Sequence, residues 1–203
     1  MNKFEVIENL RTDLLKIKED ILLAKEPNES DADIDVFITN RSKLSFSYLI
    51  KNSKLPIIFT AHNRGFAFYL AKSGLMKPID LFDTHSIKDK TIDWFLSRSN
   101  RYSNKINIKI LRTEDQLSTL IYKLIYKNKF KKSRIYKILN LKSKCKKHNL
   151  INSFNDICKL QKQSSKFIEI GNNIIEILYG KNNLVEEEIF NSLDLNIRTY
   201  KNQ

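Results

Sequence analysis

The sequence predicts a mixed α/β (α+β) fold, in which a small mixed sheet with flanking helices is followed by an α-helical C-terminal region. In the first half of the chain, short runs alternate apolar and polar side chains, as residues 33–38 do, which is typical of strands. Further on, apolar side chains recur at helical spacing, beginning with the stripe in residues 117–125. We therefore expect two parts, a mixed core in residues 1–112 and a helical region in residues 113–203.

The length and composition are those of a globular protein. With 203 residues, the chain can build one domain with a substantial core or two small ones. No run approaches the roughly 20 consecutive apolar residues that a membrane-spanning helix needs. Residues 1–20 mix acids with bases and lack the apolar stretch of a secretory signal. We therefore expect no membrane span and a cytoplasmic location.

The chain is strongly basic, with 36 Lys and Arg against 23 Asp and Glu and a net charge of +13. Such a charge favours anionic partners, namely nucleotide phosphates, nucleic acid or an acidic membrane surface. Lys, Asn and Ile are used heavily throughout, so part of the excess reflects a general bias of composition. Cys145 and Cys158 are the only cysteines, and we expect two reduced thiols and no zinc site.

The first part of the chain alternates helical and extended segments. Apolar side chains at helical spacing predict an amphipathic helix over residues 3–19, and the apolar run at residues 20–25 predicts a buried first strand. Pro27 and Asn28 mark a turn into the strand at residues 33–38. The segments predicted next are a helix over 42–52, strands at 57–61, 65–70 and 78–83, a helix over 89–98 and a strand at 106–110.

A hairpin and a helical tail complete the predicted architecture. The strands at 57–61 and 65–70 are separated by the turn Asn63-Arg64-Gly65, which predicts an antiparallel pair. After these strands, the apolar pattern takes a helical period. The predicted helices of the tail begin at residue 113 and then cover residues 131–142, 152–162, 164–179 and 184–193.

Two carboxylates stand on one face of the strand at residues 33–38. The apolar residues of this strand face one side, so Asp33 and Asp35 share the other. Their Cβ atoms are expected about 6–7 Å apart, close enough for both carboxylates to bind one or two divalent cations. A basic partner or a solvated strand face would accommodate the same pair.

A third carboxylate, Asp80, stands between two apolar residues of its strand. A charged group at such a position is costly unless it is paired or bound to a metal. If this strand lies beside the strand of the other two acids, three carboxylates meet and suit Mg²⁺, which leaves positions for phosphate oxygens and water. The alternative is an ion pair between Asp80 and a base such as Arg64 or Lys77.

The order and spacing of these motifs resemble the nucleotidyltransferase fold of the polymerase-beta superfamily, whose core presents an Asp-x-Asp pair and a third acid on an adjacent strand. The similarity is closer to bacterial nucleotidyltransferase-like proteins, some of which accompany polysaccharide-biosynthesis genes. It covers roughly residues 1–140. The segments that carry it are Ile21-Leu22-Leu23-Ala24-Lys25, Asp33-Ile34-Asp35-Val36-Phe37-Ile38, Ile79-Asp80-Leu81 and Leu111-Arg112-Thr113-Glu114-Asp115-Gln116-Leu117.

The resemblance implies a metal-dependent transfer of a nucleoside monophosphate from an NTP to an unidentified hydroxyl acceptor, with release of pyrophosphate. Asp33 and Asp35 would hold Mg²⁺ or Mn²⁺. Asp80 would complete one metal site and assist deprotonation of the acceptor hydroxyl. Such chemistry depends mainly on positioning and on neutralisation of charge.

The chain departs from the superfamily at the element that binds triphosphate. That element is a Gly-Ser pair, and no glycine precedes Gly65 here. Ser30, Lys25 and Arg64 are therefore the candidates for binding the nucleotide phosphates. An inactive relative, which kept the fold as a binding or regulatory module, is the alternative that this departure favours.

A second alternative is nucleic-acid binding by the helical tail. Residues 117–155 contain no Asp or Glu, and four aromatic residues stand among their basic ones. Such a surface suits a polyanion, whereas a solvated Lys-rich face is the alternative explanation. The basic residues are Lys123, Lys127, Lys129, Lys131, Lys132, Arg134, Lys137, Lys142, Lys144, Lys146 and Lys147, and the aromatic ones are Tyr122, Tyr126, Phe130 and Tyr136.

Overall fold

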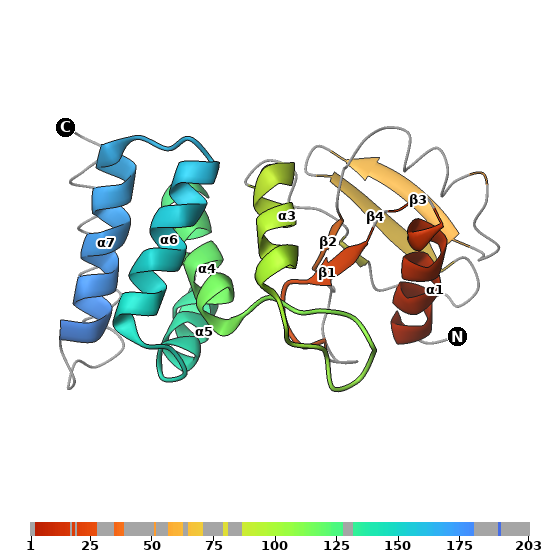
Figure 1. The fold of residues 1–203 in the computed structure, drawn as a ribbon, viewed down its shortest axis with the longest axis horizontal. Helices are drawn as coiled ribbons and strands as arrows, with labels where there is room; N and C mark the ends of the chain where they lie inside the picture. The colour runs from red at the N-terminus through yellow and green to blue at the C-terminus, as the bar shows by residue number, and fades with distance from the viewer. Residues whose placement is uncertain are drawn as a thin grey trace. The chain divides into compact units, whose positions relative to one another are not determined.

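The chain forms two compact units in a computed structural model, unit 1 (Met1–Arg112) and unit 2 (Thr113–Gln203), whose elements are labelled in Figure 1. None of the described helices is long and apolar enough to cross a membrane. The residues that the structure describes are 3–16, 18, 20–27, 35–38, 51, 57–62, 65–70, 79–80, 87–127, 132–180 and 191.

The first helix of unit 1, α1 (Lys3–Leu15), buries one apolar face. The sequence predicts this helix over residues 3–19, but it ends earlier. Lys18 adopts a φ of 63°, in the left-handed region, which a continuing α-helix does not contain. The buried apolar residues, at intervals typical of a helix, are Ile7, Leu10 and Leu14.

Strand β1 (Ile21–Leu23) lies between two extended partners. On one side it pairs antiparallel with β2 (Val36–Ile38), with Leu23 opposite Val36. On the other side a parallel bridge joins Leu23 to Ile110, and its two backbone hydrogen bonds each measure 2.9 Å. All of β1 is buried, so the predicted buried first strand is confirmed.

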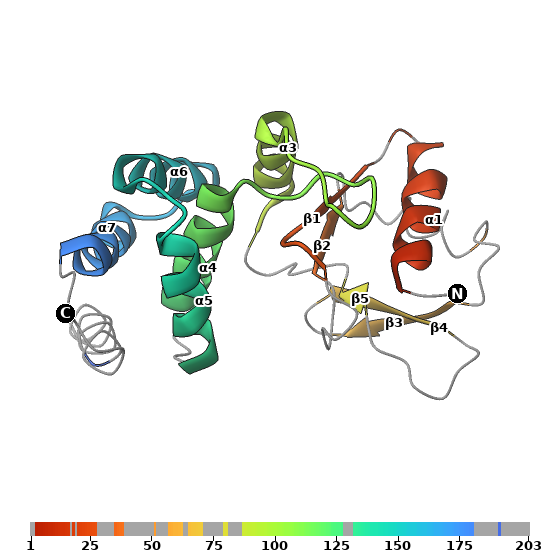
Figure 2. The same ribbon diagram turned by 90° about the horizontal axis from the view of Figure 1, so that it is seen from below.

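A second sheet contains β3 (Ile57–His62), β4 (Gly65–Leu70) and β5 (Ile79–Asp80) in that order, with antiparallel pairing (Figure 2). The register of β3 and β4 places the last residue of one opposite the first residue of the other. The predicted hairpin is therefore confirmed. Strand β5 covers part of the strand predicted at residues 78–83.

Helix α3 (Asp89–Arg98) coincides with the helix predicted over residues 89–98. It buries Ile92 and Phe95, whose spacing of three residues places them on one face. The ring of Phe95 lies 6.1 Å from the ring of Phe37, which belongs to β2. Helix α3 therefore packs against the strand that follows Asp35.

The strand predicted at residues 106–110 is confirmed in part. A bent segment, residues 104–107, precedes a bridge of Lys109 with Tyr102 and a bridge of Ile110 with Leu23. Ile106, Ile108 and Ile110 are buried, as their alternation predicts. However, the backbone N–H of Ile108 donates to the carbonyl of Ile106 at 2.8 Å, which closes a tight turn that a regular strand does not contain. The prediction of a strand is therefore wrong at Ile106 and correct at Lys109 and Ile110, which pair with neighbouring segments.

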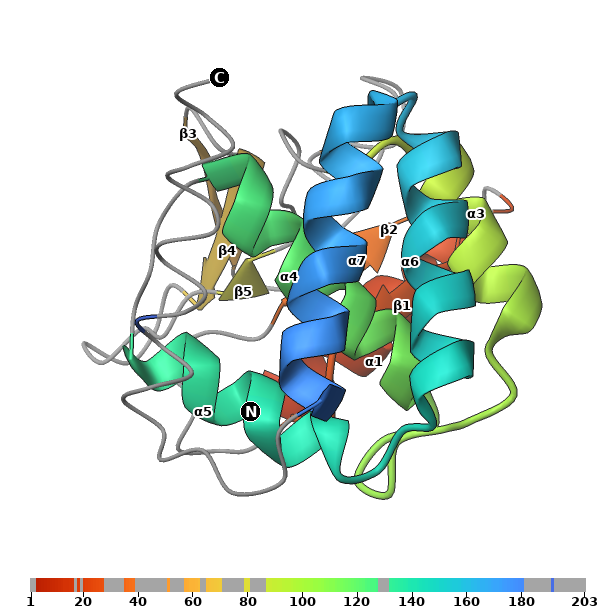
Figure 3. The ribbon, with the colours of Figure 1, turned by 90° about the vertical axis from the view of Figure 1, so that its left-hand side faces the viewer.

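Unit 2 is helical in its described residues, and α4 contacts the other three helices of the unit. Helices α6 and α7 lie side by side against it (Figure 3). Burial of Leu117, Ile121 and Leu124 forms the inner face of α4. The helices are α4 (Thr113–Lys127), α5 (Lys132–Lys142), α6 (Lys147–Leu160) and α7 (Ser165–Gly180).

These helices agree with the predicted tail in number and order as far as it is described. Helix α6 begins earlier than the predicted residues 152–162, and Lys162, with a φ of 55°, follows its end. The helices predicted over 42–52 and 184–193 lie outside the described residues, except for Lys51 and Asn191. The combination of helices with small sheets confirms a mixed α/β fold.

Candidate functional site

Asp35 lies at the entrance of strand β2, beside the end of β1. Its backbone carbonyl accepts a hydrogen bond of 3.0 Å from the N–H of Ala24, which extends the pairing of the two strands. Opposite residues of an antiparallel pair project to the same face, so the small Ala24 side chain lies on the face of the carboxylate. Asp35 is partly exposed, and its carboxylate forms no hydrogen bond or ion pair with another described side chain.

The other predicted site residues are described in part. Asp33, Ser30 and Arg64 lie outside the described residues. Lys25 is the second residue after β1 and is half-buried. The backbone of Asp80 pairs with that of Ala67, within β5 and β4.

The described pairings assign the two acid-bearing strands to different sheets. Strand β2 pairs with β1, whereas β5 pairs with β4. In the described residues, the strand of Asp80 is therefore not hydrogen-bonded to the strand that follows Asp35. No group of three or more His, Cys, Asp or Glu that could hold a metal occurs within these same residues. The side chains of Asp33 and Asp80, which the proposed site requires, are outside that search.

Glu26 is a residue of this region that sequence reasoning did not select. Its Oε1 accepts hydrogen bonds from the Ser103 hydroxyl at 2.6 Å and from the Asn104 backbone N–H at 3.1 Å. Glu26 thereby ties the end of β1 to the bent segment that follows α3. Its position in a polar turn next to Pro27 does not indicate these hydrogen bonds, because both partners lie far along the chain.

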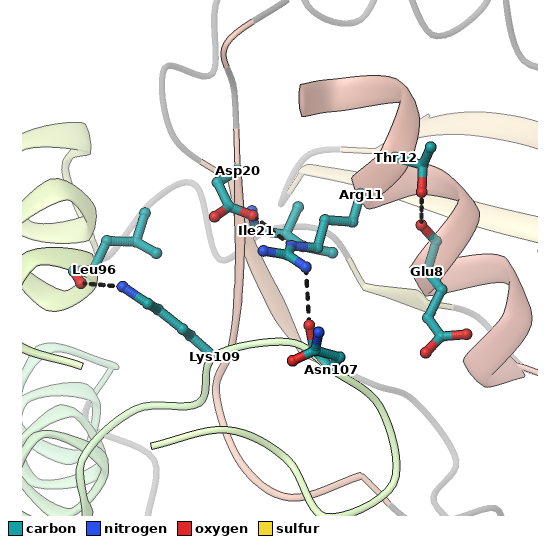
Figure 4. Close-up of polar contacts among 8 residues, drawn as sticks. All are labelled: Glu8, Arg11, Thr12, Asp20, Ile21, Leu96, Asn107 and Lys109. Atoms are coloured by element: carbon teal, nitrogen blue, oxygen red, sulfur yellow. Dashed lines mark hydrogen bonds and ion pairs between the residues drawn. The ribbon is translucent and has the colours of Figure 1, made fainter. Parts of the chain in front are cut away.

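A second set of contacts fixes the start of β1 (Figure 4). Oδ1 of Asp20 accepts hydrogen bonds from Nε of Arg11 at 2.9 Å and from the N–H of Ile21 at 2.8 Å. Nη1 of Arg11 donates to the carbonyl of Asn107 at 2.9 Å. Arg11 therefore joins α1, the first residue before β1 and the bent segment, and so holds the strand that supports Asp35.

The basic residues of unit 2 form a second candidate site. On α5, Tyr136 and Lys137 are exposed, whereas Ile135 and Ile138 are buried. On α4, Tyr126 is 47% exposed, although Tyr122 is buried. The described aromatic residues of this region thus divide between core and surface.

Comparisons of this chain with models of protein families, with curated proteins and with solved structures gave no match.

Proposed function

We propose that the chain is a metal-dependent enzyme with a nucleotidyltransferase-like fold, which transfers a nucleoside monophosphate from an NTP to a hydroxyl acceptor and releases pyrophosphate. The observation that supports this most is the position of Asp35. It is partly exposed at the entrance of a strand, beside Ala24, which follows the neighbouring strand. An NTP-dependent enzyme of this kind would act in the cytoplasm.

The acidic residues have distinct parts in the proposed reaction. A partly exposed carboxylate is the type of oxygen ligand that Mg²⁺ prefers, so Asp35 fits such a site. Mg²⁺ or Mn²⁺ held by Asp33, Asp35 and Asp80 would neutralise phosphate charge and polarise the group under attack. Asp80 would also accept the proton of the attacking hydroxyl. Positioning of the two reactants then supplies much of the acceleration.

The triphosphate requires basic or hydrogen-bonding groups from the chain. Lys25 follows Ala24, whose backbone N–H donates a hydrogen bond to the carbonyl of Asp35. We propose that Lys25, Ser30 and Arg64 bind the phosphates in place of the Gly-Ser element. A lysine or arginine near the triphosphate stabilises the charge that moves onto the leaving pyrophosphate.

Pyrophosphate release tests this proposal. The full chain is incubated with Mg²⁺, each NTP and a panel of sugar, RNA and protein acceptors, and pyrophosphate is measured by mass spectrometry. We expect release that is lost in Asp35→Asn, because the amide cannot replace a charged metal ligand. The matched control is Asp93→Asn, an exposed aspartate on α3 that should keep full activity.

If the panel lacks the acceptor, nucleotide binding provides a second test of the proposal. NTP with Mg²⁺ should raise the thermal midpoint of the chain, and Asp35→Asn should abolish the rise. Stabilisation without turnover on any acceptor would favour the inactive binding or regulatory relative. An unchanged midpoint together with no pyrophosphate would contradict both forms of the proposal.

A further inference from the structure

The end of strand β1 is hydrogen-bonded to a neighbour on each side. Leu23 uses both of its backbone groups, since its N–H donates to the carbonyl of Lys109 and its carbonyl accepts from the N–H of Leu111, each at 2.9 Å. The next residue, Ala24, donates its N–H to the carbonyl of Asp35 at 3.0 Å. The backbone of Asp35, from which the carboxylate projects, is therefore held in place by the end of β1.

Two residues beyond Ala24, a side chain fixes the position of the backbone. Oε1 of Glu26 accepts a hydrogen bond of 2.6 Å from the Ser103 hydroxyl and one of 3.1 Å from the backbone N–H of Asn104. Hydrogen bonds to a charged acceptor are roughly twice as strong as those between neutral groups. Oε2 of Glu26 is buried, and no donor among the described residues bonds to it. Within the described residues, the carboxylate is therefore held through Oε1, by two donors of one segment.

Ser103 belongs to a turn that is itself held by hydrogen bonds. Its N–H donates to the carbonyl of Ile108 at 2.9 Å. Its hydroxyl oxygen accepts from the N–H groups of Lys105 at 3.1 Å and of Ile106 at 3.3 Å, while the hydroxyl proton is donated to Glu26. Hydrogen bonds in such a chain strengthen one another. Because the same segment leads into the residues that bond to β1, Glu26 closes a ring of contacts around the end of that strand.

We propose that Glu26 and Ser103 are positioning residues for the cation site of Asp35, an inference that rests on the proposed function. Neither residue contacts the cation in this proposal. Glu26 fixes the chain two residues after Ala24, whose N–H holds the backbone of Asp35. Release of this end of β1 would therefore move Asp35 relative to the other ligands of the cation. Groups that orient metal ligands contribute about 10–100-fold to metal affinity.

Mn²⁺ binding to the full chain with a non-hydrolysable NTP, followed by electron paramagnetic resonance, tests the proposal. We expect Glu26→Ala to weaken Mn²⁺ binding by at least about tenfold, because both hydrogen bonds to Oε1 are lost. Ser103→Ala removes one of the two and should weaken binding less. The double variant should bind as weakly as Glu26→Ala alone, because the two residues act through one contact. Glu26→Gln should retain most of the affinity, since its amide oxygen accepts the same hydrogen bonds.

Ser153→Ala is the matched control, because it also removes a hydroxyl that donates to a carboxylate, Asp115 of unit 2, at 2.7 Å. It should lower the thermal midpoint and leave the Mn²⁺ affinity unchanged.

The outcomes separate this inference from the proposed function. No Mn²⁺ binding by the wild type would overturn both. If the wild type binds Mn²⁺ and Asp35→Asn does not, unchanged binding in Glu26→Ala would overturn the role of Glu26 alone. The same role is overturned if Ser153→Ala weakens binding as much as Ser103→Ala, or if Glu26→Gln loses as much affinity as Glu26→Ala, since the cause would then be charge and not position.

Discussion

The hydroxyl of Ser153 donates a hydrogen bond of 2.7 Å to Oδ1 of Asp115, and both residues are completely buried. This contact joins α6 to the first turn of α4 at the centre of unit 2. A buried carboxylate is tolerated only where hydrogen bonds replace those that water would make. Asp115 is therefore a packing residue of the helical unit, although the sequence places it among the polar residues at the start of a helix.

Loss of this hydroxyl should destabilise unit 2. We expect Ser153→Ala to lower the free energy of unfolding by about 1–3 kcal/mol, because a buried carboxylate oxygen loses a donor. Urea unfolding followed by circular dichroism measures the change. The matched control is Ser143→Ala, whose hydroxyl bonds to the Asn140 carbonyl at an exposed site, and it should change stability by less than about 0.5 kcal/mol. Equal losses in the two variants would contradict this account.

The contact between α6 and α7 depends on the absence of a side chain at Gly171. A Cβ added there would lie 1.9 Å from Cζ of Phe154, a ring that is fully buried. We expect Gly171→Ala to destabilise the chain by about 1–3 kcal/mol through overpacking. Gly180→Ala on the same helix meets nothing within 4 Å and should leave the thermal midpoint unchanged or slightly raised. A neutral Gly171→Ala would show that α6 and α7 are not in this contact.

The ion pair of Arg11 with Asp20 supports the start of β1. The two side chains are 24% and 30% exposed, so solvent weakens the pair, and we expect Arg11→Ala to cost about 1 kcal/mol. Lys16→Ala provides the comparison, because Lys16 pairs with Asp13 at a side chain that is 58% exposed. That substitution should cost less than about 0.5 kcal/mol. A chemical unfolding series that ranks the two variants in the opposite order would refute the role of Arg11.

Because the two thiols are removed from solvent, the free energy of unfolding depends on pH in the alkaline range. Burial raises the pKa of Cys158 from 9.0 to about 12, and burial with Glu114 and Asp115 raises the pKa of Cys145 to about 11. The folded state thus retains protons that the unfolded state releases. The contribution of the two thiols to the free energy of unfolding is therefore complete below pH 9.0 and is lost as the pH rises toward those pKa values.

Unfolding with urea at several pH values, under reducing conditions, measures this dependence. In Cys158→Ala the decline in stability above pH 9.0 should be shallower than in the wild type, whatever constant loss the smaller side chain causes. Identical slopes for the two proteins would mean that the Cys158 thiol does not retain its proton in the folded state. Both cysteines are free, as the sequence predicts.

The sequence predicted those elements whose residues carry a clear local pattern. The apolar run of β1 indicates a buried strand. The spacing of Ile92 and Phe95 in α3 indicates a helix and its buried face. The end of α1 could not be predicted, because Lys18 adopts a positive φ without the glycine that usually marks one. The turn between Ile106 and Ile108 was predicted as part of the strand that pairs at Lys109 and Ile110, since buried residues continue to alternate through it.

The candidate site was predictable only in its chemistry. Asp35 could be selected because an acid next to a strand of apolar residues is conspicuous in the sequence. Glu26 could not, because its partner Ser103 is 77 residues away and no local pattern links the two. Tyr122 is buried whereas Tyr126 is exposed, and this difference likewise depends on how α4 packs against its neighbours.

Cation binding tests the central proposal most directly. Mn²⁺ is added to the full chain with a non-hydrolysable NTP, and loss of the free Mn²⁺ signal in electron paramagnetic resonance reports binding. We predict binding that is lost or weakened at least about tenfold in Asp33→Asn, Asp35→Asn and Asp80→Asn alike, and retained in Asp93→Asn. Unchanged binding in Asp80→Asn, or equal loss in Asp93→Asn, would contradict a site built from the three carboxylates.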